Sequence, residues 1–195
     1  MPHPSTRIYF DFVDPLSYAV SCTLDAQSAG ADNLTPTIEW IGFELRPYPT
    51  PLTATRDPMW AGRWAQADEQ AAALNLSFAP PPLVPWTRKA HELHTFGCQQ
   101  GAGDAIRAAI FGAYFTEGKD IGRVDVLVDL ASAAGLDRTG TKAVLDVDRH
   151  EADVASARRA AETLGVRDVP SLSVDGRLVE GFPDLTDLGT LLPDR

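Results

Sequence analysis

Two residues that could carry chemistry, Asp14 and Ser17, lie in the run Asp14-Pro15-Leu16-Ser17, directly after an apolar stretch. Asp is a preferred helix N-cap and Pro is favoured at the first helical position, so the run predicts a helix start. Amides at a helix start point outward and attract ligands. Asp14 could accept hydrogen bonds, or act as a general base if burial raised its pKa. The alternative is that Asp14 only caps the helix and Ser17 completes its first turn.

A proline that directly precedes a predicted strand is the second candidate feature, in the run Val169-Pro170-Ser171. Because proline lacks an N–H for the strand ladder, it occupies the first strand position or a special turn. A cis Val169–Pro170 bond fits such a turn. The alternative is a trans proline that merely begins the hairpin.

Two histidines and two cysteines complete the candidate set. His91 and His94 are three residues apart on a predicted helix and could place two imidazoles on one face for a metal. No third ligand is evident, so we expect an exposed polar helix face and no metal site. Cys22 and Cys98 form no C-x-x-C pair, and we expect each to be a small buried residue.

The elements that must position these residues begin with a strand over Arg7 to Val13 and a helix that ends near Gly30. A second strand over Thr35 to Leu45 should lie parallel to the first, because a helix connects the two. Near the end of the chain, Ser171 to Val174 and Arg177 to Glu180 flank the turn pair Asp-Gly and predict a β-hairpin.

Between these parts the sequence predicts a helical lobe. A proline-rich stretch over Arg46 to Pro58 reads as a loop that leaves the sheet. We therefore expect an α/β domain over residues 1–56 and 148–195, with an inserted all-helical lobe over 57–147. Helical patterns cover Met59–Leu74, Trp86–Gln100, Asp104–Phe115, Val124–Ala134, Thr141–Leu145 and Arg149–Leu164, with a last short helix to Leu192. This is the element order of a thioredoxin fold interrupted after its second strand.

The two junctions together resemble the DsbA-like branch of the thioredoxin superfamily, which places an x-P-x-x run at the first helix and G-V-x-x-V-P before a hairpin. The middle of the chain is similar to a cytoplasmic subfamily, in Phe43-Glu44-Leu45-Arg46-Pro47, in Ala90-His91 and in the run from Phe111 to Ile121. That subfamily includes polyketide-pathway disulfide isomerases, 2-hydroxychromene-2-carboxylate isomerases and kappa-class glutathione transferases.

The resemblance implies a site and also a departure from it. Oxidoreductase members carry C-x-x-C, and the glutathione users carry S-P-x-S, where this chain has Asp14 and Ser17 as candidate catalytic residues. Without paired thiols these two residues cannot exchange disulfides, and a carboxylate at the helix start opposes a nearby thiolate.

The resemblance also implies a ligand-binding segment, in which the backbone of Val169 pairs with an extended peptide or glutathione. Pro170 shapes this loop, Ser171 lies beside it, and Trp86 makes a pocket near the site more apolar. Glutathione is the candidate cofactor. The resulting hypothesis is a glutathione- or small-molecule-binding isomerase- or transferase-like protein. The alternatives are a non-catalytic peptide- or ligand-binding member and, disfavoured by the missing cysteines, a thiol-disulfide oxidoreductase.

The amino-acid composition limits the classes of partner that we expect this chain to bind. The chain has 195 residues, 44% of them hydrophobic, and its 27 acidic against 17 basic residues give a net charge of -10. This sign disfavours nucleic acid as a partner. No secretory signal or apolar run long enough to cross a bilayer is evident, so we expect a cytoplasmic protein without a membrane partner. Related proteins are often homodimers, which makes a homodimer possible here.

Overall fold

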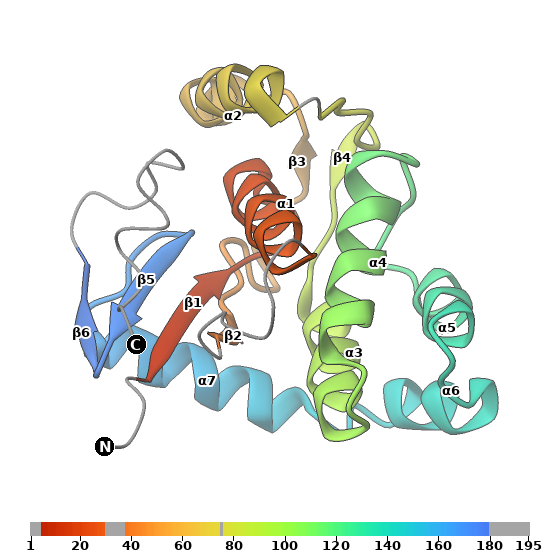
Figure 1. The fold of residues 1–195 in the computed structure, drawn as a ribbon. Helices are drawn as coiled ribbons and strands as arrows, with labels where there is room; N and C mark the ends of the chain where they lie inside the picture. Colours follow the sequence, from red (N-terminus) through yellow and green to blue (C-terminus); the bar gives the residue numbers. More distant parts are fainter. Residues whose placement is uncertain (1–4, 30–37, 75, 180–195) are drawn as a thin grey trace.

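Four strands form the central sheet, in the order β2-β1-β5-β6 (Figure 1). The computed structural model describes residues 5–29, 38–74 and 76–179. Strand β1 (Thr6–Phe10) pairs in parallel with β2 (Ile38–Gly42), as predicted. On its other side β1 pairs antiparallel with β5 (Ser171–Val174), which forms the predicted hairpin with β6 (Arg177–Leu178). The fold is thioredoxin-like.

Two helices cover the sheet, one on each face. Helix α1 (Pro15–Ala29) follows β1 directly, and helix α7 (Glu151–Leu164) crosses the opposite face (Figure 1). Gly165 ends α7 with φ at 107°, a left-handed conformation that glycine adopts without a Cβ clash. The sequence predicted both helices.

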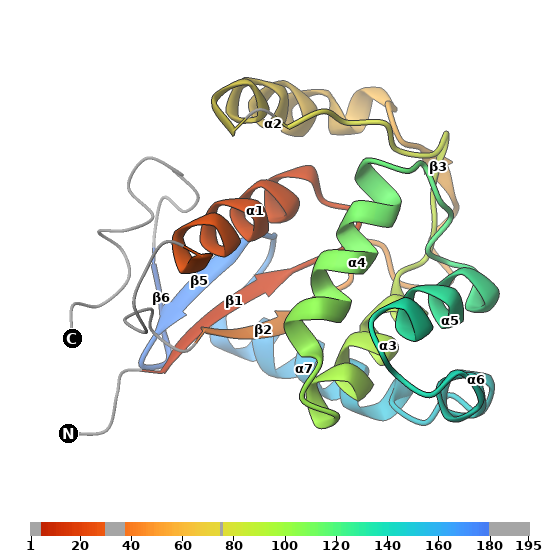
Figure 2. The ribbon, with the colours of Figure 1, turned by 45° about the vertical axis from the view of Figure 1, so that its right-hand side comes forward.

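The remaining helices lie between β2 and α7 in the chain and form the inserted lobe, beside and above the sheet (Figure 2). They are the short 3-10 helix η1 (Pro58–Trp60) and helices α2 (Ala61–Leu74), α3 (Arg88–Gln99), α4 (Gly103–Phe115), α5 (Val124–Ala133) and α6 (Arg138–Asp146). None of the described helices is long and apolar enough to cross a membrane. The predicted last helix to Leu192 lies outside the described residues.

A short pair of strands differs from the predicted loop over Arg46 to Pro58 and from the predicted all-helical lobe. Strand β3 (Thr53–Ala54) pairs antiparallel with strand β4 (Leu83–Val84) and forms a two-stranded ribbon. Each strand has only two residues and borders a proline-rich stretch, so no alternating pattern can develop. The ribbon connects the start of the lobe to the segment that leads into α3.

Sheet and lobe share one aromatic core. Phe111 of α4 is fully buried, and its ring centroid lies 5.0 Å from that of Phe12, 5.6 Å from that of Tyr18 and 5.8 Å from that of Phe10. Trp60 and Trp64 of the lobe are buried in the same cluster. The lobe is therefore fixed to the end of β1 and the start of α1.

Truncation of this core should be costly. We expect Phe111→Ala to lower the free energy of unfolding by about 3–5 kcal/mol, because a buried ring is lost and a cavity remains. Urea denaturation followed by circular dichroism measures the change. The control Val147→Ala, at a side chain that is 70% exposed, should change it by no more than about 0.5 kcal/mol. Equal effects of the two substitutions would contradict a shared core.

Candidate functional site

The side chain of Asp14 lies fully buried at the start of α1. Its Oδ2 accepts hydrogen bonds from the backbone N–H and the hydroxyl of Ser17, each at 2.6 Å. The backbone N–H of Asp14 donates to the carbonyl of Asp11 at 3.1 Å, which turns the chain out of β1. Asp14 is thus the helix cap that the sequence predicted, and Ser17 completes the first turn.

A guanidinium from the lobe covers the other side of this carboxyl group. Arg63 of α2 donates through Nη1 to Asp14 Oδ1 at 2.7 Å and to the carbonyl of Val169 at 2.6 Å. Its Nη2 also pairs with the carboxylate of Asp168. One side chain from the lobe therefore joins the start of α1 to the loop before β5.

The loop before β5 presents the second half of the site. The Val169–Pro170 peptide bond is cis, and both residues are buried. The Val169 N–H donates to Asp168 Oδ1 at 2.8 Å, and the Ser171 hydroxyl donates to the Asp168 carbonyl at 2.7 Å. The structure therefore brings Asp14, Ser17 and Val169 together through Arg63, with Pro170 and Ser171 beside them.

Burial sets the acid–base character of Asp14. Loss of water raises its pKa to about 6, and this effect outweighs the opposite effects of Arg63 and Ser17. Such a carboxyl group exchanges its proton just below neutral pH, the range in which a general acid or base is effective. Both of its oxygens already accept hydrogen bonds, so catalysis would require a substrate to displace Ser17 or Arg63.

Cysteine chemistry is weak in the described part of the chain. Cys22 and Cys98 are free thiols, and burial raises the pKa of each. Cys22 is partly buried on α1, beyond the first turn. Cys98 is exposed as a residue, although its sulfur is partly covered, so the prediction that the residue is buried was wrong. It lies near the end of α3, where the last residues of the helix are exposed to solvent.

The prediction that His91 and His94 form an exposed polar helix face was also wrong. His91 and His94 are 1% and 5% exposed and do not form a polar surface, because α3 packs them against the rings of Phe10 and Phe12. Within the described residues no group of three potential ligands could hold a metal ion. Asp11 compensates the burial of His91, since its Oδ1 lies 3.1 Å from His91 Nε2.

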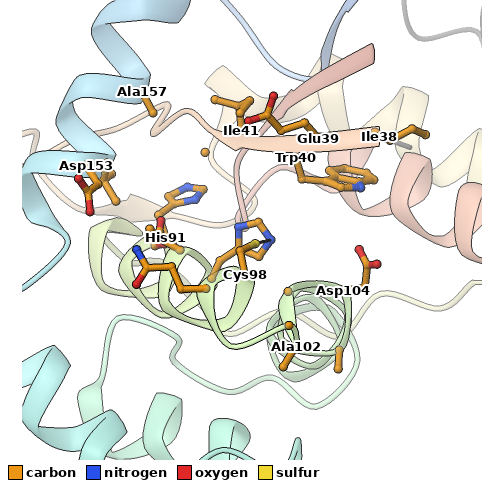
Figure 3. Close-up of a pocket in the computed structure, with 18 residues that line it drawn as sticks. Ile38, Glu39, Trp40, Ile41, His91, Cys98, Ala102, Asp104, Asp153 and Ala157 are labelled. Carbon is orange, nitrogen blue, oxygen red and sulfur yellow. Dashed lines mark hydrogen bonds between the residues drawn. The ribbon is translucent and has the colours of Figure 1, made fainter. Parts of the chain in front are cut away.

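A cavity of about 870 Å³ lies beside these histidines, between β2 and helices α3, α4 and α7 (Figure 3). Cys98 Sγ lies 3.6 Å from His94 Nε2 here. Burial lowers the pKa of His94 to about 3, and burial raises that of Cys98, so both are neutral at pH 7. The pair therefore lacks the thiolate that nucleophilic catalysis requires.

Trp86 does not join the Asp14 site. Its indole N–H donates to the carbonyl of Thr50 at 2.8 Å, and its ring packs against Tyr48. Together with Tyr48 it lines a separate cavity, whose lining does not include Asp14, Ser17 or Val169.

Sequence reasoning missed Arg63, which completes the site. Its partners Asp14 and Val169 are 49 and 106 residues away in the chain. An arginine on a polar helix is ordinarily a solvated residue. The available signal was indirect, because a buried aspartate at a helix start requires a cation or several donors.

The fold and this site define a thioredoxin-like domain in which Asp and Ser stand at the helix start beside a cis-proline loop. The model of the DSBA-like thioredoxin domain matches residues 6–192. The chain belongs to this family. A curated relative, the uncharacterized protein YwbO of Bacillus subtilis, is 27% identical over 181 residues, which cover 90% of this chain and 88% of YwbO.

Solved structures agree on the fold. A probable DsbA oxidoreductase from Streptomyces coelicolor superposes with a TM-score of 0.79 at 23% identity, covering 97% of this chain and 88% of that one. A 2-hydroxychromene-2-carboxylate isomerase gives 0.71 at 18% identity, with coverages of 95% and 91%. The cytosolic disulfide reductase DsbM of Pseudomonas aeruginosa, in its structure with GSH, gives 0.69 at 21% identity, with coverages of 96% and 98%.

Asp14 should give the protein a distinct pH dependence. Its pKa is about 6 when folded and has the ordinary value of 3.8 when unfolded, so the folded state binds the proton more tightly. The free energy of unfolding of the wild type, minus that of Asp14→Asn, should therefore fall as the pH rises from about 4 to about 6. The fall should be at most about 1.4 kcal/mol per pH unit, and the difference should be constant above pH 6. Urea denaturation at a series of pH values measures this difference, and a difference independent of pH would contradict the assignment.

Arg63 and Asp14 should be energetically coupled. We expect Arg63→Gln to lower the free energy of unfolding by about 2–4 kcal/mol, because it leaves a buried carboxylate without its cation. The double variant with Asp14→Asn should lose less than the sum of the single variants, with a coupling of about 1–3 kcal/mol. Arg138→Gln, at an exposed pair with Asp129, is the control and should cost about 1 kcal/mol or less. Additive single effects would show that the contact contributes no stability.

Proposed function

We propose that this chain binds glutathione or a related small thiol compound where α1 meets the loop before β5, and that it acts as an isomerase- or transferase-like member of its family. The observation that carries the proposal is the shared contact of Arg63 with Asp14 and with the carbonyl of Val169. This contact places a cation, a helix start and a strand-like backbone segment together. A peptide-like thiol with free carboxylates matches these three features.

The residue types at the helix start argue against disulfide exchange there. That reaction needs a thiolate to attack and a second thiol to resolve the mixed disulfide. Asp14 and Ser17 supply neither, and Cys22 is a partly buried thiol whose pKa is raised. A thiol chemistry at this site would therefore use the sulfur of the ligand.

The internal hydrogen bonds indicate how a ligand would bind. The carbonyl of Val169 can accept a ligand N–H once Arg63 turns away, and Arg63 can then pair with a ligand carboxylate. A ligand thiol near α1 would meet Asp14, which favours the neutral S–H over a thiolate when ionised. Below pH 6 Asp14 itself becomes neutral and this repulsion disappears.

A second candidate function is ligand binding without catalysis. It is favoured by the full burial of the Asp14 side chain and by the three hydrogen bonds that its carboxyl group already accepts, which restrict the access of a substrate. A lower catalytic turnover number in Asp14→Ala than in the wild type, with the variant still folded, would favour the catalytic function. Ligand affinity without turnover, and without sensitivity to Asp14, would favour the binding module.

The proposal includes a cellular setting. A glutathione-binding site suits the cytoplasm, where free thiols such as those of Cys22 and Cys98 stay reduced. A homodimer, frequent among similar proteins, is the assembly we propose, and light scattering on the purified protein tests it.

Calorimetric titration with reduced glutathione tests the binding proposal. We expect wild-type protein to bind with a dissociation constant of about 1 mM or tighter. Asp14→Ser should bind more tightly, because a hydroxyl replaces the carboxylate that opposes a thiolate. The control Glu39→Gln removes one exposed carboxylate that pairs with Arg7 and should leave binding unchanged. Absence of binding to both the wild type and Asp14→Ser would overturn the proposal.

A further inference from the structure

A second cavity, of about 610 Å³, lies apart from the Asp14 site, between the segment that follows β2 and the segment that leads into α3. Its lining combines aromatic and apolar side chains with six charged residues, which are Glu44, Arg88, Lys89, Asp120, Arg123 and Glu151. The residues that matter are Glu44, Pro47, Tyr48, Leu52, Pro85 and Trp86. Neither Arg63 nor any residue of the loop before β5 contributes to it.

Tyr48 and Trp86 form an aromatic corner in this cavity. Their ring centroids are 5.1 Å apart and their planes meet at 81°. The hydrogen bond from Trp86 Nε1 to the Thr50 carbonyl fixes the indole orientation. Both rings remain accessible, since Tyr48 is 71% and Trp86 37% exposed. Large aromatic rings held in place but not covered by their own chain are typical of a binding surface.

Glu44 supplies an unpaired acid beside this corner. It is 7% exposed, and its carboxyl group makes no hydrogen bond or ion pair with any described residue. Arg158 donates to the backbone carbonyl of Glu44 and to the carboxylate of Glu162, and its guanidinium lies over the ring of Phe43. Burial raises the pKa of Glu44, while His91, Arg158 and Arg88 favour its ionised form from a distance. A buried carboxyl without a partner is costly, so a ligand that supplied one would be favoured.

The cations at the rim are already committed to other carboxylates. Arg88 pairs with Asp148 at 2.6 Å and with Glu92 at 2.8 Å, and Lys89 pairs with Asp148 at 2.5 Å. Arg123, the third cation of the lining, pairs with Asp125 at 2.7 Å, so each of the three lining cations already has a carboxylate partner. Among the described residues, the carboxyl groups of Glu44 and Asp120 in this lining have no ion pair, and Glu44 is the buried one of the two.

We propose that this cavity is a binding site for a small organic ammonium ion, held in the corner formed by the rings of Tyr48 and Trp86 with Glu44 as its counterion. Two aromatic rings at a right angle attract a weakly hydrated cation through their negative faces. The apolar side chains of Leu52 and Pro85 suit methyl groups on the nitrogen. A hard metal ion would find only one carboxyl group and aromatic walls, which match its oxygen preference poorly.

Choline and its uncharged carbon isostere, 3,3-dimethyl-1-butanol, test the proposal because they share a shape and differ in charge. Calorimetric or NMR titration of the wild-type protein, up to about 50 mM ligand, should show choline binding at least about tenfold more tightly than the alcohol. Equal affinities for the two compounds, or no choline binding in this range, would overturn the proposal.

Substitutions then locate the site. Glu44→Gln should remove the preference for choline, whereas Glu39→Gln, which removes the same charge at an exposed pair with Arg7, should preserve it. Trp86→Leu should weaken choline more than the alcohol. If Glu44→Gln does not fold, the isostere comparison in the wild type and in Trp86→Leu decides alone, and an unchanged preference in Trp86→Leu rejects the aromatic corner. These measurements use neither glutathione nor Asp14, so their result is independent of the proposed thiol site.

Discussion

The burial of the Asp14 carboxyl group imposes the strongest constraint on the arrangement of this protein. A carboxylate without solvent must receive hydrogen bonds and a nearby cation, or it takes up a proton. Ser17 supplies two donors from the same helix turn, and Arg63 supplies the cation from the inserted lobe. The same guanidinium reaches the carbonyl of Val169, so the position of the lobe, the start of α1 and the loop before β5 are set together. The shared aromatic core around Phe111 holds these parts at the distance the contact requires.

The local parts of this arrangement could be predicted from the sequence because their causes are local. Asp14-Pro15 marks a helix start, Gly165 marks a helix end, and the turn pair after Val174 marks a hairpin, each through backbone preferences of a few neighbouring residues. The candidate residues Asp14, Ser17 and Val169 also meet in space, because the strand order brings the end of β1 beside the start of β5.

The parts that could not be predicted depend on contacts between distant segments. Arg63 has no local feature that distinguishes it from a solvated arginine. The burial of His91 depends on Asp11, eighty residues earlier in the chain. One oxygen of the Asp11 side chain lies within hydrogen-bond distance of the His91 imidazole, and the other accepts the N–H of Leu45. The short ribbon of β3 and β4 has no periodicity to detect, and Trp86 is oriented by the carbonyl of Thr50. The two cavities are therefore formed by contacts between distant segments, although His91, His94 and Trp86 in their linings were candidates from the sequence.

The position of Arg63 also bears on how this scaffold relates to redox members of its family. A thiol in place of the Asp14 side chain would lie at a helix N-terminus with a guanidinium nearby, two conditions that lower the pKa of a thiol, whereas the burial of this position would raise it. A stabilised thiolate makes the reduced form of a dithiol pair more favourable and the corresponding disulfide a stronger oxidant. In this chain a helix start and a guanidinium, both of which favour an anion, surround a buried carboxyl group. Thiol chemistry at the start of α1 would require a cysteine in place of Asp14, whereas Arg63 and the loop before β5 could keep their positions.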